Sequence, residues 1–322
     1  MRYVMALDAG GTKCEAVLVR ADGQVLGWGR CDVHSAKSGR DTYGSGRSRE
    51  TMREAFRQAL GRTRCAELHV VHIGPHFQSL VVKPAAVGRL IHHTAAEGPA
   101  TLALAGEDYG VVALAGTGAT VYARTRDGRT IQLDGLGPQL GDYGSGYQIG
   151  SLAVRAAARS GWHPRHFTSL APLVFDACVR QPPDPRGVRL VRYMLAGHDR
   201  AEIAALARLV IAEAEHGDAV ARRILREAAG ALAETLRDGV DQLRLRRAAM
   251  PLIGTGGIIA HSRYYWNHLC RLARTFAPRF RPKVVDLPPA VGMALCVLRC
   301  LNPEHYPQAR ATLLATSRAR RL

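Results

Sequence analysis

The chain has 322 residues, of which 47% are hydrophobic, so it is long enough for two domains and too apolar for a disordered chain. Its formal net charge of +17 comes from 44 Lys and Arg against 27 Asp and Glu, and the basic residues, almost all arginine, are spread along the chain without a recognisable nucleic-acid-binding module. No hydrophobic run reaches bilayer length and no signal peptide is apparent, so we expect a cytoplasmic protein. The seven scattered cysteines form no CxxC pair and are expected to be free thiols. We expect neither a membrane nor a nucleic acid as partner.

The first half of the chain is predicted to contain two β-meanders. Alternating hydrophobic residues predict strands at 3–7, 15–20 and 25–28, joined by short turns. A polar loop is expected at 34–48, followed by a helix at 49–60 and a strand at 68–73. Further strands are predicted at 110–115, 120–124 and 130–133, the last two joined by an Asp127-Gly128 turn.

The second half is mainly helical. Helices are predicted at 147–159, almost continuously over 201–247, and at 290–300, with strands at 249–253 and 283–286. The basic tail at 309–322 is expected to be a surface helix or a frayed end. The order of strands followed by helices thus occurs twice, which predicts a duplicated α/β fold with domains at 1–117 and 118–322.

Three glycine-rich turns each follow a hydrophobic strand directly. They are Leu7-Asp-Ala-Gly-Gly-Thr-Lys13, Leu114-Ala-Gly-Thr-Gly-Ala119 and Leu252-Ile-Gly-Thr-Gly-Gly-Ile258. Glycine lets a backbone approach a phosphate closely, and successive backbone N–H groups form an anion-binding concavity. A single loop of this kind is weak support, because tight hairpins also need glycine. None of the three is a P-loop or stands in a Rossmann context.

Together the three loops resemble the phosphate-1, phosphate-2 and adenosine motifs of the actin, hexokinase and Hsp70 superfamily. The run Gly135-Leu-Gly-Pro-Gln-Leu-Gly-Asp-Tyr-Gly-Ser-Gly-Tyr-Gln-Ile-Gly150 resembles the signature of the BadF/BadG/BcrA/BcrD ATPase family, which includes N-acetylglucosamine kinases. Leu287-Pro-Pro-Ala-Val-Gly-Met-Ala294 resembles that family's final helix, so the resemblance extends from residue 6 to about residue 300. It implies two actin-like (ribonuclease H-like) domains with a nucleotide cleft between them, ATP and Mg²⁺ as cofactors, and a homodimer.

The resemblance also assigns residues to the nucleotide and the metal. Asp8, at the end of the first strand, would face Mg²⁺, because a small, hard cation suits one carboxylate together with nucleotide phosphates. The alternative reading of Asp8 is a turn residue, and that of the glycines is backbone geometry alone. The residues assigned to the nucleotide are Gly10, Gly11, Thr12, Lys13, Gly116, Thr117, Gly118, Gly254, Thr255, Gly256 and Gly257.

The residues expected to contact the sugar that accepts the phosphoryl group, which form the acceptor side of the site, are assigned with less support from residue type. Related sugar kinases carry an Asp about nineteen residues before the second glycine loop, near the acceptor hydroxyl. Here Glu97 occupies that register and is the predicted catalytic base, although it is one methylene longer and a role in stabilising a helix N-terminus is the alternative. Asp142 and Thr120 are predicted to contact the sugar, with turn stabilisation as the alternative for Asp142.

Several acceptor-side positions depart from the family's pattern. Tyr143 stands where Glu is usual and Ala119 where Ser is common, and the loops at 34–38 and 74–77 also differ. We predict an ATP-dependent sugar kinase that acts on an amino sugar (N-acetylglucosamine- or glucosamine-like) by Mg²⁺-assisted in-line transfer. One alternative is an ATPase of the BadF/BcrA type, disfavoured because no cysteine lies between Cys65 and Cys178. The other is a catalytically degenerate, nucleotide-binding regulator.

Overall fold

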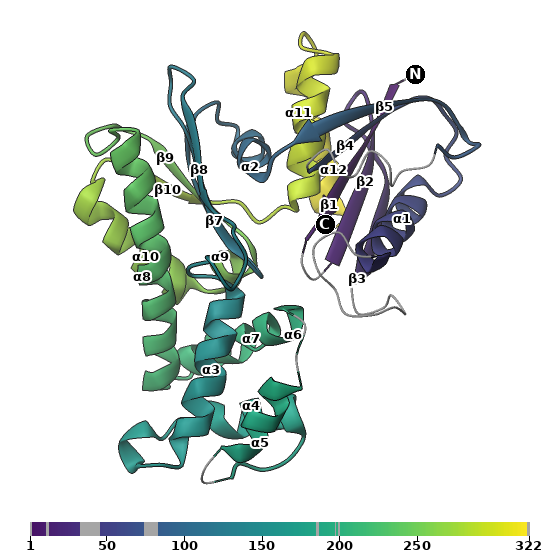
Figure 1. Cartoon of the computed structure of the whole chain (residues 1–322). Coiled ribbons are helices and arrows are strands. Elements are labelled where there is room, and N and C mark those ends of the chain that lie inside the picture. The colour runs from purple at the N-terminus through teal and green to yellow at the C-terminus, as the bar shows by residue number, and fades with distance from the viewer. Residues whose placement is uncertain are drawn as a thin grey trace. The chain divides into compact units, whose positions relative to one another are not determined.

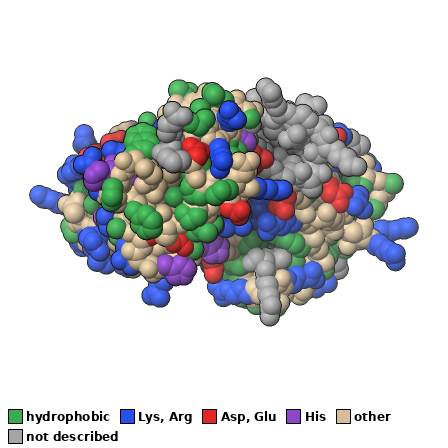
Figure 2. Space-filling view, turned by 90° about the horizontal axis from the view of Figure 1, so that it is seen from below, with side chains coloured by type: hydrophobic (Ala, Val, Ile, Leu, Met, Phe, Trp, Pro, Cys, Tyr) green, Lys and Arg blue, Asp and Glu red, His purple; other side chains and the backbone are tan. Residues whose placement is uncertain are grey.

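The computed structural model describes residues 2–10, 13–32, 46–73, 83–184, 187–196, 198 and 200–320. The chain forms two compact units, the first made of residues 1–108 with 287–322 and the second of residues 109–286 (Figure 1). Among the described helices, none is both long and hydrophobic enough to cross a membrane. On the face shown in Figure 2, Lys and Arg side chains are interspersed with acidic and hydrophobic ones, in agreement with the spread of arginine along the sequence.

The first unit is a mixed five-stranded sheet with helices packed against it. Its order is β3-β2-β1-β4-β5, antiparallel from β3 to β1 and parallel from β1 to β5. The central hydrophobic residues of β1, from Val4 to Leu7, are buried, as expected of a central strand covered on both faces. The elements are β1 (Arg2–Ala9), β2 (Lys13–Arg20), β3 (Val25–Asp32), α1 (Gly46–Leu60), β4 (Cys65–Ile73), β5 (Val87–Ala95), α2 (Glu97–Ala105), α11 (Pro289–Leu301) and α12 (Tyr306–Ala319).

The second unit repeats this topology. Its order, β10-β9-β6-β7-β8, is parallel from β10 to β6 and antiparallel from β6 to β8, so the predicted duplication is confirmed. Its elements are β6 (Gly110–Ala115), β7 (Ala119–Arg124), β8 (Thr130–Asp134), α3 (Gly146–Ser160), a 3₁₀ turn (Pro164–His166), α4 (Leu170–Val179), α5 (Val188–Leu195), α6 (Arg200–Ala205), α7 (Ala207–Glu215), α8 (Ala219–Gln242), β9 (Pro251–Thr255), α9 (Gly257–His261), α10 (Arg263–Phe276) and β10 (Arg281–Val284).

Several stretches of secondary structure differ from the predicted pattern, among them the helices α4, α5, α9 and α10, which were not predicted. The helical stretch at 201–247 is three helices, α6, α7 and α8. The helical stretch breaks between α7 and α8 because Gly217 adopts a φ of 101° and Asp218 then caps α8 by accepting a hydrogen bond from the Ala221 N–H. Strand β5 was not predicted. It lies at the edge of the sheet and most of its side chains are partly exposed, so its sequence lacks the alternation of hydrophobic and polar residues that predicts a strand.

The C-terminal helices belong to the first unit and not to the second. α11 packs against α2 and β1, and a Cβ added at Gly292 would lie 2.3 Å from the Ala100 carbonyl oxygen. The predicted division at 117/118 therefore differs from the structure, in which the chain returns to its first unit after residue 286. The physical reason is the hydrophobic face of α11, which is buried against the first sheet and α2.

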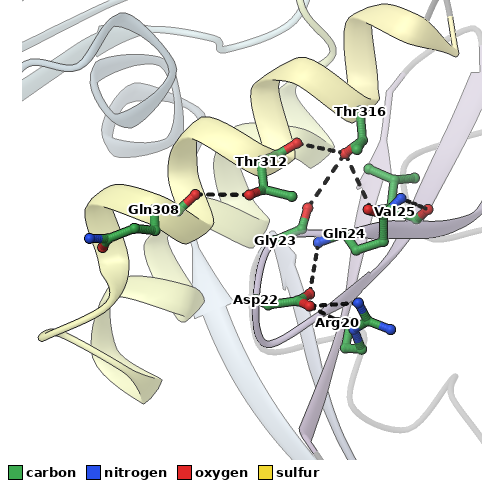
Figure 3. A network of polar contacts seen from close by, with 8 residues as sticks. All are labelled: Arg20, Asp22, Gly23, Gln24, Val25, Gln308, Thr312 and Thr316. Atoms are coloured by element: carbon green, nitrogen blue, oxygen red, sulfur yellow. Dashed lines mark hydrogen bonds and ion pairs between the residues drawn. The ribbon is translucent and has the colours of Figure 1, made fainter.

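Helix α12 is fastened to the turn between β2 and β3 (Figure 3). The Thr316 hydroxyl accepts a hydrogen bond from the Val25 N–H at 3.4 Å and donates to the Thr312 carbonyl oxygen at 2.8 Å. Gly23 has a φ of 91°, and a Cβ added to it would lie 1.9 Å from the Ala309 carbonyl oxygen. The predicted tail is thus a helix, and this close approach of backbones shows that it is packed rather than frayed.

We expect Gly23→Ala to destabilise the fold by about 2 kcal/mol or more, because a side chain there meets both an unfavourable φ and the backbone of α12. Gly128→Ala is the matched control, since Gly128 has a similar φ of 87° but has nothing within 4 Å of an added Cβ. Unfolding in denaturant measures both variants. Equal losses in the two would mean that the contact with α12 contributes nothing.

Candidate functional site

Two of the predicted carboxylates stand at one edge of the first sheet. Asp8 lies in the last two residues of β1, and Glu97 begins α2 directly after β5. In the parallel ladders, Leu7 pairs with His72, and Ile73 in turn pairs with Ala95. The carboxyl ends of β1, β4 and β5 therefore meet at this edge, where parallel α/β sheets commonly bind ligands.

Asp8 is a buried carboxylate with an unsatisfied oxygen. Its exposed fraction is 8%, and no donor within the described part of the chain reaches its Oδ1 atom. Burial, followed by the charges of Glu97 and Glu15, raises the pKa of Asp8 from 3.8 to about 7, against a smaller opposing effect of Lys13. Buried polar atoms in folded proteins normally have partners, so this oxygen is a candidate ligand atom.

The turn after β1 is closed by its own backbone. The Gly10 N–H donates to the Lys13 carbonyl oxygen at 2.9 Å, and Lys13 Nζ donates to Glu15 Oε1 at 2.6 Å. Gly11 and Thr12, also predicted to bind the nucleotide, lie outside the described residues, as do the loops at 34–38 and 74–77. Glu15 was not predicted as a site residue, because a single Glu within a strand carries no motif.

Glu97 is the first residue of α2, as expected. Its side chain is half-buried, and burial raises the pKa of its carboxyl group. A carboxylate with a raised pKa is a stronger proton acceptor once it is ionised, which suits a general base. The alternative role is also compatible with this position, since an acidic side chain in the first turn favours the helix dipole.

The two glycine loops of the second unit lie next to each other. Leu114, before the first loop, pairs with Thr255, in the second, across the parallel strands β6 and β9. Gly256 has a φ of 92°, and a Cβ added to it would lie 2.4 Å from the Ala115 carbonyl oxygen. Only glycine fits this approach, so the two predicted nucleotide loops are built against one another.

The first turn of helix α3 is hydrogen-bonded to the loop at 116–118. The Gly146 N–H donates to the Gly116 carbonyl oxygen at 2.7 Å, and the Tyr147 N–H donates to the Thr117 carbonyl oxygen at 3.3 Å. The first N–H groups of a helix have no partner within the helix itself. Here they fix the conformation of the glycine loop.

Asp142 is buried against the same loop. Its Oδ1 accepts a hydrogen bond from the Ala119 N–H at 3.0 Å, and its Oδ2 accepts one from Arg200 Nη2 at 2.5 Å. Burial raises the pKa of Asp142, although the bonds from Ala119 and Arg200 oppose this. Both oxygens thus have a partner inside the protein, and the predicted sugar contact stays a prediction. Arg200 was not predicted, since nothing in the sequence connects it with Asp142.

Two further residues complete this part of the site. Asp134 accepts hydrogen bonds from the Gly135, Asp142 and Tyr143 N–H groups at 2.7, 2.6 and 2.8 Å, so it organises the whole glycine-rich loop. An Asp directly before a glycine-rich run is a turn signal that could have identified it. The Thr120 hydroxyl donates to the Leu133 carbonyl oxygen at 3.0 Å, and its predicted sugar contact is likewise still a prediction.

We expect Arg200→Met to lower the free energy of unfolding by roughly 1–3 kcal/mol, because it leaves the Asp142 charge buried without its partner. The loop at 116–119, which is predicted from the sequence to bind the nucleotide, should lose its alignment as well, and on that prediction the KM for ATP rises roughly 10-fold or more. Asp142→Asn combined with Arg200→Met should recover part of the stability, since no buried charge remains. Unfolding in denaturant and steady-state kinetics test this, and additive losses in the double variant would contradict it.

Among the described residues, no three His, Cys, Asp or Glu side chains are grouped so as to hold a metal ion. A single carboxylate such as that of Asp8 suits Mg²⁺ when the ion also binds nucleotide phosphates.

The chain is similar to known kinases in sequence and in fold. An N-acetylmuramic acid/N-acetylglucosamine kinase of Clostridium acetobutylicum is 26% identical over 297 residues, which cover 87% of this chain and 93% of that protein. An N-acetyl-D-glucosamine kinase of Dictyostelium discoideum is 29% identical over 194 residues, 60% of each chain.

Two solved structures share the fold. One is described as an N-acetylglucosamine kinase of Chromobacterium violaceum (TM-score 0.64, 23% identity, 92% of this chain and 98% of that chain). The other is a ROK family glucokinase of Streptomyces griseus in complex with glucose and AMPPNP (TM-score 0.59, 16% identity, 92% and 99%). These similarities confirm the predicted fold class of two actin-like α/β domains. A model of the BadF/BadG/BcrA/BcrD ATPase family matches residues 7–271, and the chain belongs to this family.

Proposed function

We propose that the chain is an ATP-dependent kinase that phosphorylates a hydroxyl group of an amino sugar of the N-acetylglucosamine class. The observation that carries the proposal is the placement of Asp8 and Glu97, two carboxyl groups with raised pKa values, at one edge of the first sheet. The relatives named as amino-sugar kinases support the substrate class. A cytoplasmic location and a homodimer belong to the same proposal.

In the proposed reaction Glu97 acts as the general base. Its carboxylate accepts the proton of the acceptor hydroxyl while the hydroxyl oxygen forms a bond to the γ-phosphorus atom of ATP. The bond between that phosphorus atom and the β–γ bridging oxygen breaks in line, and ADP leaves with the electron pair. The raised pKa of Glu97 favours this proton transfer, because it brings the base closer in strength to the group that it deprotonates.

Asp8 and Lys13 serve the phosphate groups. A bound Mg²⁺ ion would neutralise the charge that develops on the phosphoryl oxygens. The residues fit such an ion, because Asp8 offers a buried carboxylate oxygen that no described donor reaches. The charge of Lys13 acts on this carboxylate and opposes the rise of its pKa. The two glycine loops of the second unit, at 116–118 and 254–257, are assigned to the phosphates and the adenosine.

Consumption of ATP in the presence of Mg²⁺ tests the proposal with a panel of N-acetylated, free amino, neutral and anhydro sugars. We expect at least one N-acetylated or free amino sugar to stimulate turnover well above the background hydrolysis, and mass spectrometry to show one added phosphate on that sugar. ATP binding without stimulation by any sugar would favour an ATPase of the BadF/BcrA type or a regulator. Glu97→Gln serves as the control for background hydrolysis by contaminating enzymes.

A further inference from the structure

A second buried carboxylate lies beside Asp8 and has no part in the reaction described above. Glu15, on β2, is 3% exposed and stands directly opposite Asp8 in the antiparallel ladder between β1 and β2. Residues paired in this way project from the same face of a sheet, with their Cβ atoms about 4.5–5.5 Å apart. The two carboxylates therefore share one buried environment.

Among the described residues, partners reach only one oxygen of Glu15. Lys13 Nζ donates to Glu15 Oε1 at 2.6 Å, and Nη1 of the half-exposed Arg30 approaches the same oxygen at 3.9 Å. In the part of the chain that the structure describes, no donor reaches Glu15 Oε2, and none reaches Asp8 Oδ1. Two neighbouring buried carboxylates, each with an unsatisfied oxygen, are unfavourable in the free protein, because burial removes the water that would otherwise donate to them.

A purely structural role does not require this arrangement. The bond to Lys13 needs one acceptor oxygen, which a neutral glutamine would also provide. The second carboxylate oxygen and the negative charge need a positive partner that the described side chains supply only in part. Unfavourable burial of this kind is typical of ligand sites, where binding of the ligand relieves it. Mg²⁺ usually keeps several of its waters in protein sites, and outer carboxylates that accept hydrogen bonds from such shells tune the binding of the metal.

We propose that Glu15 is a positioning residue of the nucleotide site. Its Oε1 atom holds the Lys13 ammonium group beside the first glycine loop, and its Oε2 atom accepts a hydrogen bond from the hydration shell of the divalent cation that Asp8 holds. This inference rests on the proposed function only in that it requires a nucleotide and a divalent cation at this edge of the sheet; it does not depend on which acceptor is phosphorylated.

The test compares Glu15→Gln with the wild-type protein in calorimetric titrations with ADP, in the presence of either Mg²⁺ or EDTA. We expect the gain in ADP affinity that Mg²⁺ provides to fall about 10-fold or more in the variant. Affinity in EDTA should change by less than about 3-fold, because the glutamine oxygen still accepts the bond from Lys13. The melting temperature of the free variant should be equal to or higher than that of the wild type, since a buried charge has been removed. Glu54→Gln makes the same chemical change on the surface of α1 and should leave the affinity gain unaltered.

The outcomes separate this inference from the proposed function. A Glu15→Gln protein that keeps the full gain in ADP affinity from Mg²⁺, whether or not it loses stability, overturns the role of Glu15 alone. A wild-type protein without any gain from Mg²⁺ overturns both. A loss of the gain in the variant, in a protein that no sugar stimulates, supports Glu15 and overturns the sugar-kinase proposal.

Discussion

Asp8→Asn is expected to stabilise the free protein while it abolishes Mg²⁺-dependent phosphoryl transfer. The carboxylate is buried beside Glu15 and Glu97, and its pKa is raised to about 7. Asparagine keeps the size of the side chain but removes the charge, so the repulsion and the cost of burying that charge disappear. The cation loses its protein ligand at the same time, and kcat/KM should fall about 10²–10³-fold or more.

The gain in stability should depend on pH in a defined direction. Since the folded pKa of Asp8 is raised above the ordinary 3.8, the folded chain keeps a proton that the unfolded chain releases between about pH 4 and 7. The wild type therefore loses stability as pH rises through this window, and above pH 7 the loss is complete. Asparagine does not ionise, so the variant should exceed the wild type by roughly 1–4 kcal/mol at pH 8 and by almost nothing near pH 4.

Unfolding in denaturant at pH 4.5, 6 and 8, with EDTA and without nucleotide, measures this difference. Asp22→Asn is a suitable control, because Asp22 is an exposed carboxylate whose pKa is lowered by its bond to Arg20. A stability difference for Asp8→Asn that is the same at all three pH values would show that the charge of Asp8 is not its cause. A variant less stable than the wild type at pH 8 would contradict the raised pKa itself.

Glu97→Gln is expected to reduce kcat for the stimulating sugar about 10²–10⁴-fold, with little change in the KM for ATP. The side chain keeps its shape and its place at the start of α2, but the amide cannot accept the hydroxyl proton. Because burial raises the pKa of Glu97, the wild-type kcat should increase with pH as this group loses its proton, and the residual activity of the variant should lack this increase.

Two controls separate catalysis from helix stabilisation. Glu107→Gln makes the same change just beyond the end of α2 and should leave kcat unaltered. Glu97→Asp keeps the charge with a shorter side chain, and should retain more activity than Glu97→Gln while changing the helix in a similar way. Calorimetry of ADP binding checks that each variant still binds nucleotide. A Glu97→Gln protein with full kcat would assign Glu97 to the helix alone.

The sequence by itself determined the repeated α/β pattern, the three glycine loops and the positions of Asp8 and Glu97. These features are local: a hydrophobic strand followed by glycines is visible in adjacent residues, because close backbone approach excludes a side chain there. Gly256, whose added Cβ would collide with the Ala115 carbonyl group, shows the same constraint in the fold. The duplication was visible for the same reason, since each half repeats strands and helices in one order.

The tertiary structure alone decided which of these local features meet. α11 and α12 return to the first unit because their hydrophobic faces match its sheet, and no sequence pattern records the surface that a helix will cover. The pairing of Asp142 with Arg200 joins residues 58 positions apart. The strength of this ion pair depends on the burial of both groups, which the sequence does not show. Glu15 became a candidate only through its register opposite Asp8 and through an oxygen that no described donor reaches, because hydrogen-bond partners depend on the packed environment and not on the residue itself.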